Sequence, residues 1–114
     1  MKVVISDYVW PNIDIEKNFF DSKNIELVVS KNKSDLKKQI VDADGLLFCF
    51  ESIDEDILRS SKNLKVAQRY GIGVDNINIE VATELGIVVS NIPDYCIDEV
   101  SDHAMSMILS LNRL

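Results

Sequence analysis

Leu46-Leu47-Phe48-Cys49-Phe50 is a continuous apolar run near the middle of the 114-residue chain. Apolar residues that follow one another without alternation are typical of strands buried on both faces of a parallel sheet. Four further short runs lie on either side of it, at 3–5, 27–29, 65–67 and 87–89. The pattern therefore predicts five short strands buried within one parallel sheet.

Longer and more polar segments separate these runs. Apolar residues fall at helical spacing in 34–41 and 54–60, and short helices are also expected at 13–20 and 79–85. Pro11 excludes a helix interior just before the first of them. Strand followed by helix, repeated along the chain, indicates βαβ units and an α/β domain.

Individual residues mark where some of these helices begin and end. Ser52, followed three positions later by Glu55, has the spacing of a capping box and predicts the start of a helix there. Asn78 stands just before the segment 79–85, and Gly86 follows it as a C-terminal stop.

The segment 98–114 contains neither glycine nor proline and predicts one long terminal helix. Acidic residues crowd its first turn, where the helix dipole favours anions. Its apolar residues form one stripe, at Val100, Ala104, Met107, Ile108 and Leu111. A stripe of this kind left exposed seeks a partner, so we expect a homo-oligomer that forms through this helix.

Charge and composition exclude several classes of function. The net charge of −7 argues against binding to nucleic acid or to an anionic membrane, and no apolar stretch approaches membrane-spanning length. The two cysteines, Cys49 and Cys96, belong to no short-spaced Cys/His cluster, so no metal site is expected. Free thiols fit a reducing cytoplasm, with Cys49 as a small buried hydrophobe.

The loop after the fourth predicted strand holds the densest set of chemically informative residues, Arg69-Tyr70-Gly71-Ile72-Gly73-Val74-Asp75-Asn76-Ile77. In an open parallel sheet, ligands bind beyond the carboxyl ends of the strands. Glycines let the backbone approach an anion such as a carboxylate, and Arg69 could add a charge-assisted contact. A tight turn capped by Asp75 and Asn76 is the structural alternative. The dinucleotide fingerprint is excluded, because its third glycine is replaced by Asn76 and it follows the first strand of its unit.

Several segments in register strengthen the functional interpretation. The 69–77 loop, then 82–89, then Asn91-Ile92-Pro93, then 99–104 resemble consecutive landmarks of the D-isomer-specific 2-hydroxyacid dehydrogenases. The resemblance covers residues 69 to 114 by motif and the rest of the chain by architecture. It implies a flavodoxin-like parallel sheet of about five strands with flanking helices, which ends in a long inter-domain helix.

The resemblance also implies roles and domain boundaries. Residues 1–96 would form the substrate-binding domain, and 97–114 the start of a helix that leads to a dinucleotide-binding domain absent from this sequence. The implied positions are Arg69, Gly71, Ile72 and Gly73 for substrate, and Cys96 and Val100 for cofactor. No catalytic residue is expected in this chain, because the family's catalytic Arg, Glu and His lie downstream of the point that matches Leu114. His103, which lies on the terminal helix, is expected to be structural.

The implied function is the substrate-binding part of an oxidoreductase that acts on the CH–OH group of a D-2-hydroxy acid or the matching 2-keto acid, inactive alone. The cofactor would be NAD, with NADP left open because the residue that reads the ribose would lie beyond the chain. The alternative within the family is a dinucleotide-sensing, corepressor-like protein that acts through protein contacts. A response-regulator receiver domain is excluded, because Phe50 and Ser90 stand near the places of its phosphoacceptor Asp and its Lys.

Overall fold

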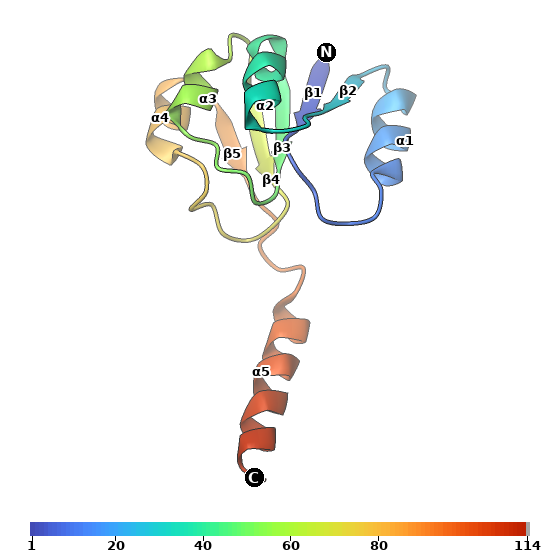
Figure 1. The fold of residues 1–114 in the computed structure, drawn as a ribbon, viewed down its shortest axis with the longest axis vertical. Coiled ribbons are helices and arrows are strands. Elements are labelled where there is room, and N and C mark those ends of the chain that lie inside the picture. The colour runs from blue at the N-terminus through green and yellow to red at the C-terminus, as the bar shows by residue number, and fades with distance from the viewer. Residues whose placement is uncertain (114) are drawn as a thin grey trace.

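Five parallel strands form one sheet within residues 1–113, the part of the chain that the computed structural model describes (Figure 1). The strand order is β2-β1-β3-β4-β5, which is the flavodoxin-like order. The elements in chain order are β1 (Lys2–Ile5), α1 (Asp14–Ser22), β2 (Glu26–Val29), α2 (Lys33–Gln39), a 3₁₀ turn (Ile40–Asp42), β3 (Gly45–Phe48), α3 (Glu55–Ser60), β4 (Val66–Arg69), α4 (Ile79–Glu84), β5 (Val88–Ser90) and α5 (Ile97–Leu111). The predicted α/β sheet with flanking helices is confirmed.

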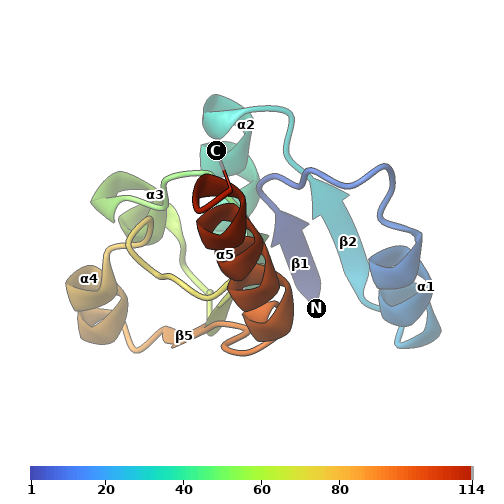
Figure 2. The ribbon, with the colours of Figure 1, turned by 90° about the horizontal axis from the view of Figure 1, so that it is seen from below.

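The hydrophobic core lies between one face of the sheet and the helices α2, α3 and α4. Each of these helices contributes buried aliphatic side chains that meet the strands, and Phe48 from β3 lies at 0% exposure among them. The side chains that are almost fully buried include Val4, Leu36, Ile40, Leu46, Phe48, Ile57 and Leu58. Figure 2 shows α2 and α3 on one side of the sheet and α1 on the other.

The second face of the sheet is largely open. Val66 on β4 and Val88 on β5 are 40% and 64% exposed. Beside them, residues of β1, β3 and β4 together with Phe20 and Ile25 line a groove of about 280 Å³. The expectation of burial on both faces is therefore wrong for β4 and β5. Three of the four helices between the strands pack on the same face, and α1 contacts the sheet at the β2 edge.

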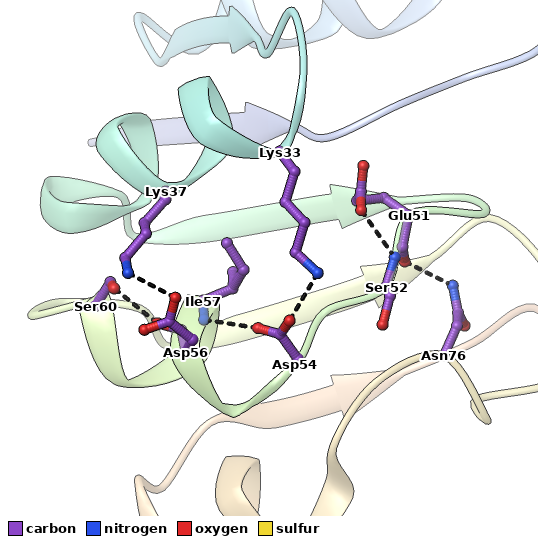
Figure 3. Close-up of polar contacts among 9 residues, drawn as sticks. All are labelled: Lys33, Lys37, Glu51, Ser52, Asp54, Asp56, Ile57, Ser60 and Asn76. Carbon is purple, nitrogen blue, oxygen red and sulfur yellow. Dashed lines mark hydrogen bonds and ion pairs between the residues drawn. The ribbon is translucent and has the colours of Figure 1, made fainter.

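Side-chain hydrogen bonds to backbone N–H groups mark where α3 and α4 begin. The start of α3 differs from the prediction. The predicted capping box at Ser52 is wrong, because Asp54 caps α3 by accepting a hydrogen bond from Ile57 N at 3.0 Å (Figure 3). The same carboxylate also forms an ion pair with Lys33 Nζ of α2, at 2.6 Å. A carboxylate gains from the helix N-terminal dipole as well as from the N–H group, which favours Asp54 over the serine.

The ends of α4 are as the sequence predicts. The Asn78 side chain accepts a hydrogen bond from Val81 N at 3.0 Å, as an N-cap does. Gly86 follows the helix with φ of +70°, a left-handed conformation that glycine adopts without steric cost.

Helix α5 extends away from the body of the domain (Figure 1). It contains no buried residue. Val100, Met107, Ile108 and Leu111 of its stripe are each more than half exposed, and Ala104 is also exposed. Within residues 1–113, no helix is both long and apolar enough to cross a membrane.

Candidate functional site

Four loops meet at the carboxyl ends of the strands, on the side of the sheet from which α5 leaves (Figure 1). The chain runs from β1 outward to β2 and then crosses back to β3 on the other side, so the sheet order reverses between β1 and β3. Open α/β sheets bind ligands at such a switch point. The loops after β1, β3, β4 and β5 are therefore the place to look for a site.

Asp7, just after β1, holds the loop that follows β3. One carboxylate oxygen accepts hydrogen bonds from Ser6 Oγ at 2.6 Å and Cys49 N at 2.9 Å. The other accepts from Phe50 N at 2.6 Å and Glu51 N at 3.2 Å. These bonds turn the chain out of the sheet, so β3 ends at Phe48 rather than at Phe50 as the apolar run predicted.

The same contacts fix the charge of Asp7. Partial burial by itself raises the pKa of this carboxyl, but the hydrogen bonds from Ser6 and from the three backbone N–H groups outweigh burial and lower the pKa below 3.8. Burial and the neighbouring Asp7 carboxylate in turn raise the pKa of the Cys49 thiol. Cys49 is 4% exposed, which confirms its prediction as a buried residue.

Arg69 and Asn76 tie the β3 loop to the loop after β4. The Arg69 guanidinium donates to the carbonyl of Cys49 at 3.1 Å and to the carbonyl of Gly73. The Asn76 amide donates to the carbonyl of Cys49 at 3.2 Å. It also donates to the carbonyl of Glu51 at 2.9 Å (Figure 3). Both hydrogen bonds of the Arg69 guanidinium go to backbone carbonyls, so Arg69 stabilises the shape of the turn.

In the turn at 71–73, two backbone carbonyls accept hydrogen bonds from the loop after β5, whereas the N–H groups donate none within residues 1–113. Gly71 O accepts from Ile92 N at 3.0 Å, and Ile72 O accepts from Asn91 Nδ2 at 2.7 Å. A planar trans peptide points the next N–H the opposite way, so these two bonds orient the N–H groups of Ile72 and Gly73. Among residues 1–113, the N–H groups of residues 71 to 73 donate no hydrogen bond. Successive free N–H groups form a concave site for an anion.

The two glycines of this turn are needed for different reasons. Neither has a positive φ. A Cβ on Gly73 would come within 2.7 Å of Asp75 Oδ1 and 3.1 Å of the Arg69 guanidinium, whereas a Cβ on Gly71 would meet only ordinary contacts of 3.5 Å or more. A side chain at position 73 would therefore displace Asp75 and press on Arg69, whereas one at position 71 would not.

An apolar pocket of about 310 Å³ adjoins the turn. Tyr70 directly precedes Gly71, and the backbone N–H of Ile92 donates a hydrogen bond to the Gly71 carbonyl. The other lining residues come from the loops after β1, β3 and β5: Val9, Trp10, Cys49, Phe50 and Tyr95. None of these side chains was predicted for a substrate site, because short loops carry no periodicity that would bring them together.

Trp10 and Tyr70 form the aromatic wall of this pocket. Their rings meet edge to face with centroids 4.6 Å apart, and Tyr8 lies 5.8 Å from Trp10. Burial and a hydrogen bond from its hydroxyl to Glu16 at 2.9 Å raise the pKa of Tyr70. Tyr8 and Trp10 are both partly exposed, and Trp10 lines the pocket.

The positions predicted for the cofactor lie apart from the turn along the chain. Cys96 stands at the N-cap of α5, and Val100 in its first turn is 62% exposed. His103, which also lies on α5, is exposed. In residues 1–113 no group of His, Cys, Asp and Glu side chains could hold a metal ion.

Comparison with known proteins shows which family this chain belongs to. The model of the catalytic domain of D-isomer specific 2-hydroxyacid dehydrogenases matches residues 3–110. The chain belongs to this family. This dehydrogenase domain is 32% identical to D-3-phosphoglycerate dehydrogenase of Methanocaldococcus jannaschii over 114 residues, which cover 99% of the chain and 21% of that protein. It is 34% identical to the enzyme of the same name from Bacillus subtilis over 113 residues, 98% of the chain and 21% of that protein.

Solved structures agree with the dehydrogenase assignment. The crystal structure of NAD⁺-bound 3-phosphoglycerate dehydrogenase from Entamoeba histolytica superposes with a TM-score of 0.81 at 29% identity, over 95% of this chain and 38% of that one. An NAD-dependent formate dehydrogenase from Staphylococcus aureus, at 22% identity and a TM-score of 0.83, shares the fold over 96% of this chain and 38% of that one. This dehydrogenase domain spans about a fifth of the length of the curated phosphoglycerate dehydrogenases that it matches.

Proposed function

We propose that this chain binds the carboxylate of a D-2-hydroxy acid, or of the matching 2-keto acid, on the N–H groups of Ile72 and Gly73. In this role it is the substrate-binding part of an NAD- or NADP-dependent oxidoreductase. The observation that supports the proposal is the pair of tethered carbonyls, Gly71 O and Ile72 O, which leave the two N–H groups oriented and without an acceptor in residues 1–113. Family membership supplies the substrate class.

The cofactor fits this chain only in part. NAD or NADP would supply hydride exchange at the substrate's C2 carbon when bound. The turn at 71–73 lacks the third glycine of a dinucleotide fingerprint and follows the fourth strand, so it does not match a pyrophosphate site. We propose Cys96 and Val100 as neighbours of a cofactor that is held mainly by another domain. The free thiols of Cys49 and Cys96 accord with a cytoplasmic protein.

The chain's own residues would position the substrate. The turn at 71–73 holds the carboxylate, and the apolar pocket beside it receives the rest of the substrate. The only histidine of the sequence, His103, is exposed on α5, so the proton for the substrate oxygen has to come from a group outside the turn. We therefore expect the chain to bind substrate weakly and not to turn it over.

The test is a titration of ¹⁵N-labelled chain with D-lactate, with lactamide as the matched ligand that lacks the carboxylate. The amide resonances of Ile72 and Gly73 should shift with D-lactate and not with lactamide, because only the carboxylate is an anion. The same sample should not oxidise NADH with 2-keto acids. Equal shifts with both ligands, or no shift at the turn, would contradict the carboxylate site.

We also propose that the chain self-associates through α5. The support is the exposed apolar stripe of this helix, on which Ile108 is 53% and Leu111 71% exposed. Light scattering during gel filtration should give a mass above that of a monomer, and the fraction of oligomer should rise with concentration. Ile108→Asp should yield a monomer, whereas Ser106→Asp, on the opposite side of the helix, should not. A monomer at every concentration would count against the proposal.

A further inference from the structure

The pocket beside the turn carries information on which 2-hydroxy acid is bound. Its lining consists of aliphatic, aromatic and thiol side chains from four loops, and none of these residues carries a charge. The pocket meets the turn at its first residue, since Tyr70 directly precedes Gly71 and Ile92 N donates to Gly71 O at 3.0 Å. A substrate that is held by its carboxylate at the turn and extends past Tyr70 therefore meets this apolar surface.

The charged groups around the pocket disfavour a second anion. Arg69 is the nearest cation in the chain sequence, but its guanidinium is held by the carbonyls of Cys49 and Gly73. A second hollow continues from Trp10 and Tyr70 towards α1, and its one charged lining residue is Glu16. A phosphate or second carboxylate there would lose its hydration and meet a carboxylate instead of a cation.

We infer that this site takes a 2-hydroxy or 2-keto acid with an uncharged, apolar side chain of about leucine size, and not a phosphorylated or dicarboxylic one. The inference rests on the proposed carboxylate site. It separates this chain from the relatives named D-3-phosphoglycerate dehydrogenase, with which it shares 32% and 34% identity. Phe50 and Trp10, which contribute to the apolar surface of the pocket, lie on loops outside the sheet.

The chain offers a direct probe of the pocket, because Trp10 is its only tryptophan. We would titrate D-lactate, (R)-2-hydroxy-4-methylpentanoate and 3-phospho-D-glycerate, three 2-hydroxy acids that differ in the side chain, and follow Trp10 fluorescence together with the amide shifts of Ile72 and Gly73. The apolar acid should bind about tenfold or more tightly than D-lactate, because each buried methylene adds to the affinity. The phosphorylated acid should bind no more tightly than D-lactate.

The outcomes separate the two proposals. Amide shifts at the turn with equal affinities for the three acids, or with tightest binding of 3-phosphoglycerate, would overturn the side-chain preference and leave the carboxylate site in place. Absence of any amide shift at the turn would overturn the carboxylate site and the preference with it.

A pair of variants tests the same inference from the protein side. Phe50→Arg places a cation at the pocket, where the phenylalanine side chain is 67% exposed and can be replaced without loss of core packing. Phe19→Arg is the matched control, since Phe19 is 57% exposed on α1 and does not line this pocket. Phe50→Arg should bind 3-phosphoglycerate more tightly than the apolar acid, and Phe19→Arg should keep the original order. An unchanged order in Phe50→Arg, with its fold intact by circular dichroism, would overturn the inference.

Discussion

Replacing Asp7 with alanine should lower the free energy of unfolding by about 2 to 4 kcal/mol. The substitution removes four hydrogen bonds to one carboxylate and leaves the N–H groups of Cys49, Phe50 and Glu51 without their acceptor. A hydrogen bond to a charged group contributes more to stability than one between neutral groups. Because the site is only partly buried, water can hydrogen-bond the N–H groups in the variant and offset part of the lost stability. Urea unfolding followed by circular dichroism measures the change.

Asp7→Asn is the matched variant for the charge. The amide keeps one acceptor oxygen and turns an NH₂ group toward N–H donors. We therefore expect a free energy of unfolding between those of the wild type and Asp7→Ala. Because the pKa of Asp7 is lower in the folded chain than its ordinary value of 3.8, its charge stabilises the fold above that value. This stabilisation is lost as the pH falls below 3.8 toward the lowered pKa. The difference between wild type and Asp7→Asn should therefore shrink on acidification, and a constant difference would contradict the assignment.

Gly73→Ala should weaken the binding of D-lactate at least about tenfold, which corresponds to about 1.4 kcal/mol. The added Cβ would stand 2.7 Å from Asp75 Oδ1 and 3.1 Å from the Arg69 guanidinium. Asp75 is exposed and can move, but Arg69 cannot move without loosening its bond to the Gly73 carbonyl. The turn would then lose the orientation of its N–H groups. The amide titration described above measures the affinity.

Gly71→Ala is the control for this change. A Cβ on Gly71 meets Arg69 at 3.5 to 3.8 Å, an ordinary van der Waals distance, and the φ of Gly71 is not positive. Its affinity for D-lactate should therefore stay close to that of the wild type, and both variants should unfold at similar urea concentrations. Equal affinity in the two variants would show that the geometry at Gly73 does not matter for binding.

The alternation of apolar runs with helical segments was enough to predict the fold. The five runs became the five strands, because a continuous apolar segment bounded by polar ones has few other ways to be buried. The ends of α4 were also readable, since Asn78 and Gly86 act through their own backbone neighbours. The start of α3 was misread, because Ser52 and Asp54 both suit an N-cap and local spacing does not choose between them.

The loop at 69–77 could be singled out from sequence, but how it is held could not. Its glycines and its place after a strand indicated an anion site, and the family resemblance pointed to Ile72 and Gly73. The contacts that orient those two N–H groups come from Asn91 and Ile92, about twenty positions away along the chain. Nothing in the spacing of these residues predicts hydrogen bonds between two loops.

The sequence by itself determined a parallel α/β sheet and the residues of one turn, because apolar runs and glycine spacing are patterns of neighbouring residues. Only the tertiary structure decided which sheet face is covered, where β3 ends, and that Trp10, Phe50 and Tyr70 line one pocket. Those features depend on the carboxyl ends of separate strands meeting at one edge. At that edge, Asp7 accepts hydrogen bonds from the loop after β3. The hydrogen-bonded carbonyls of Gly71 and Ile72 orient the N–H groups that follow them.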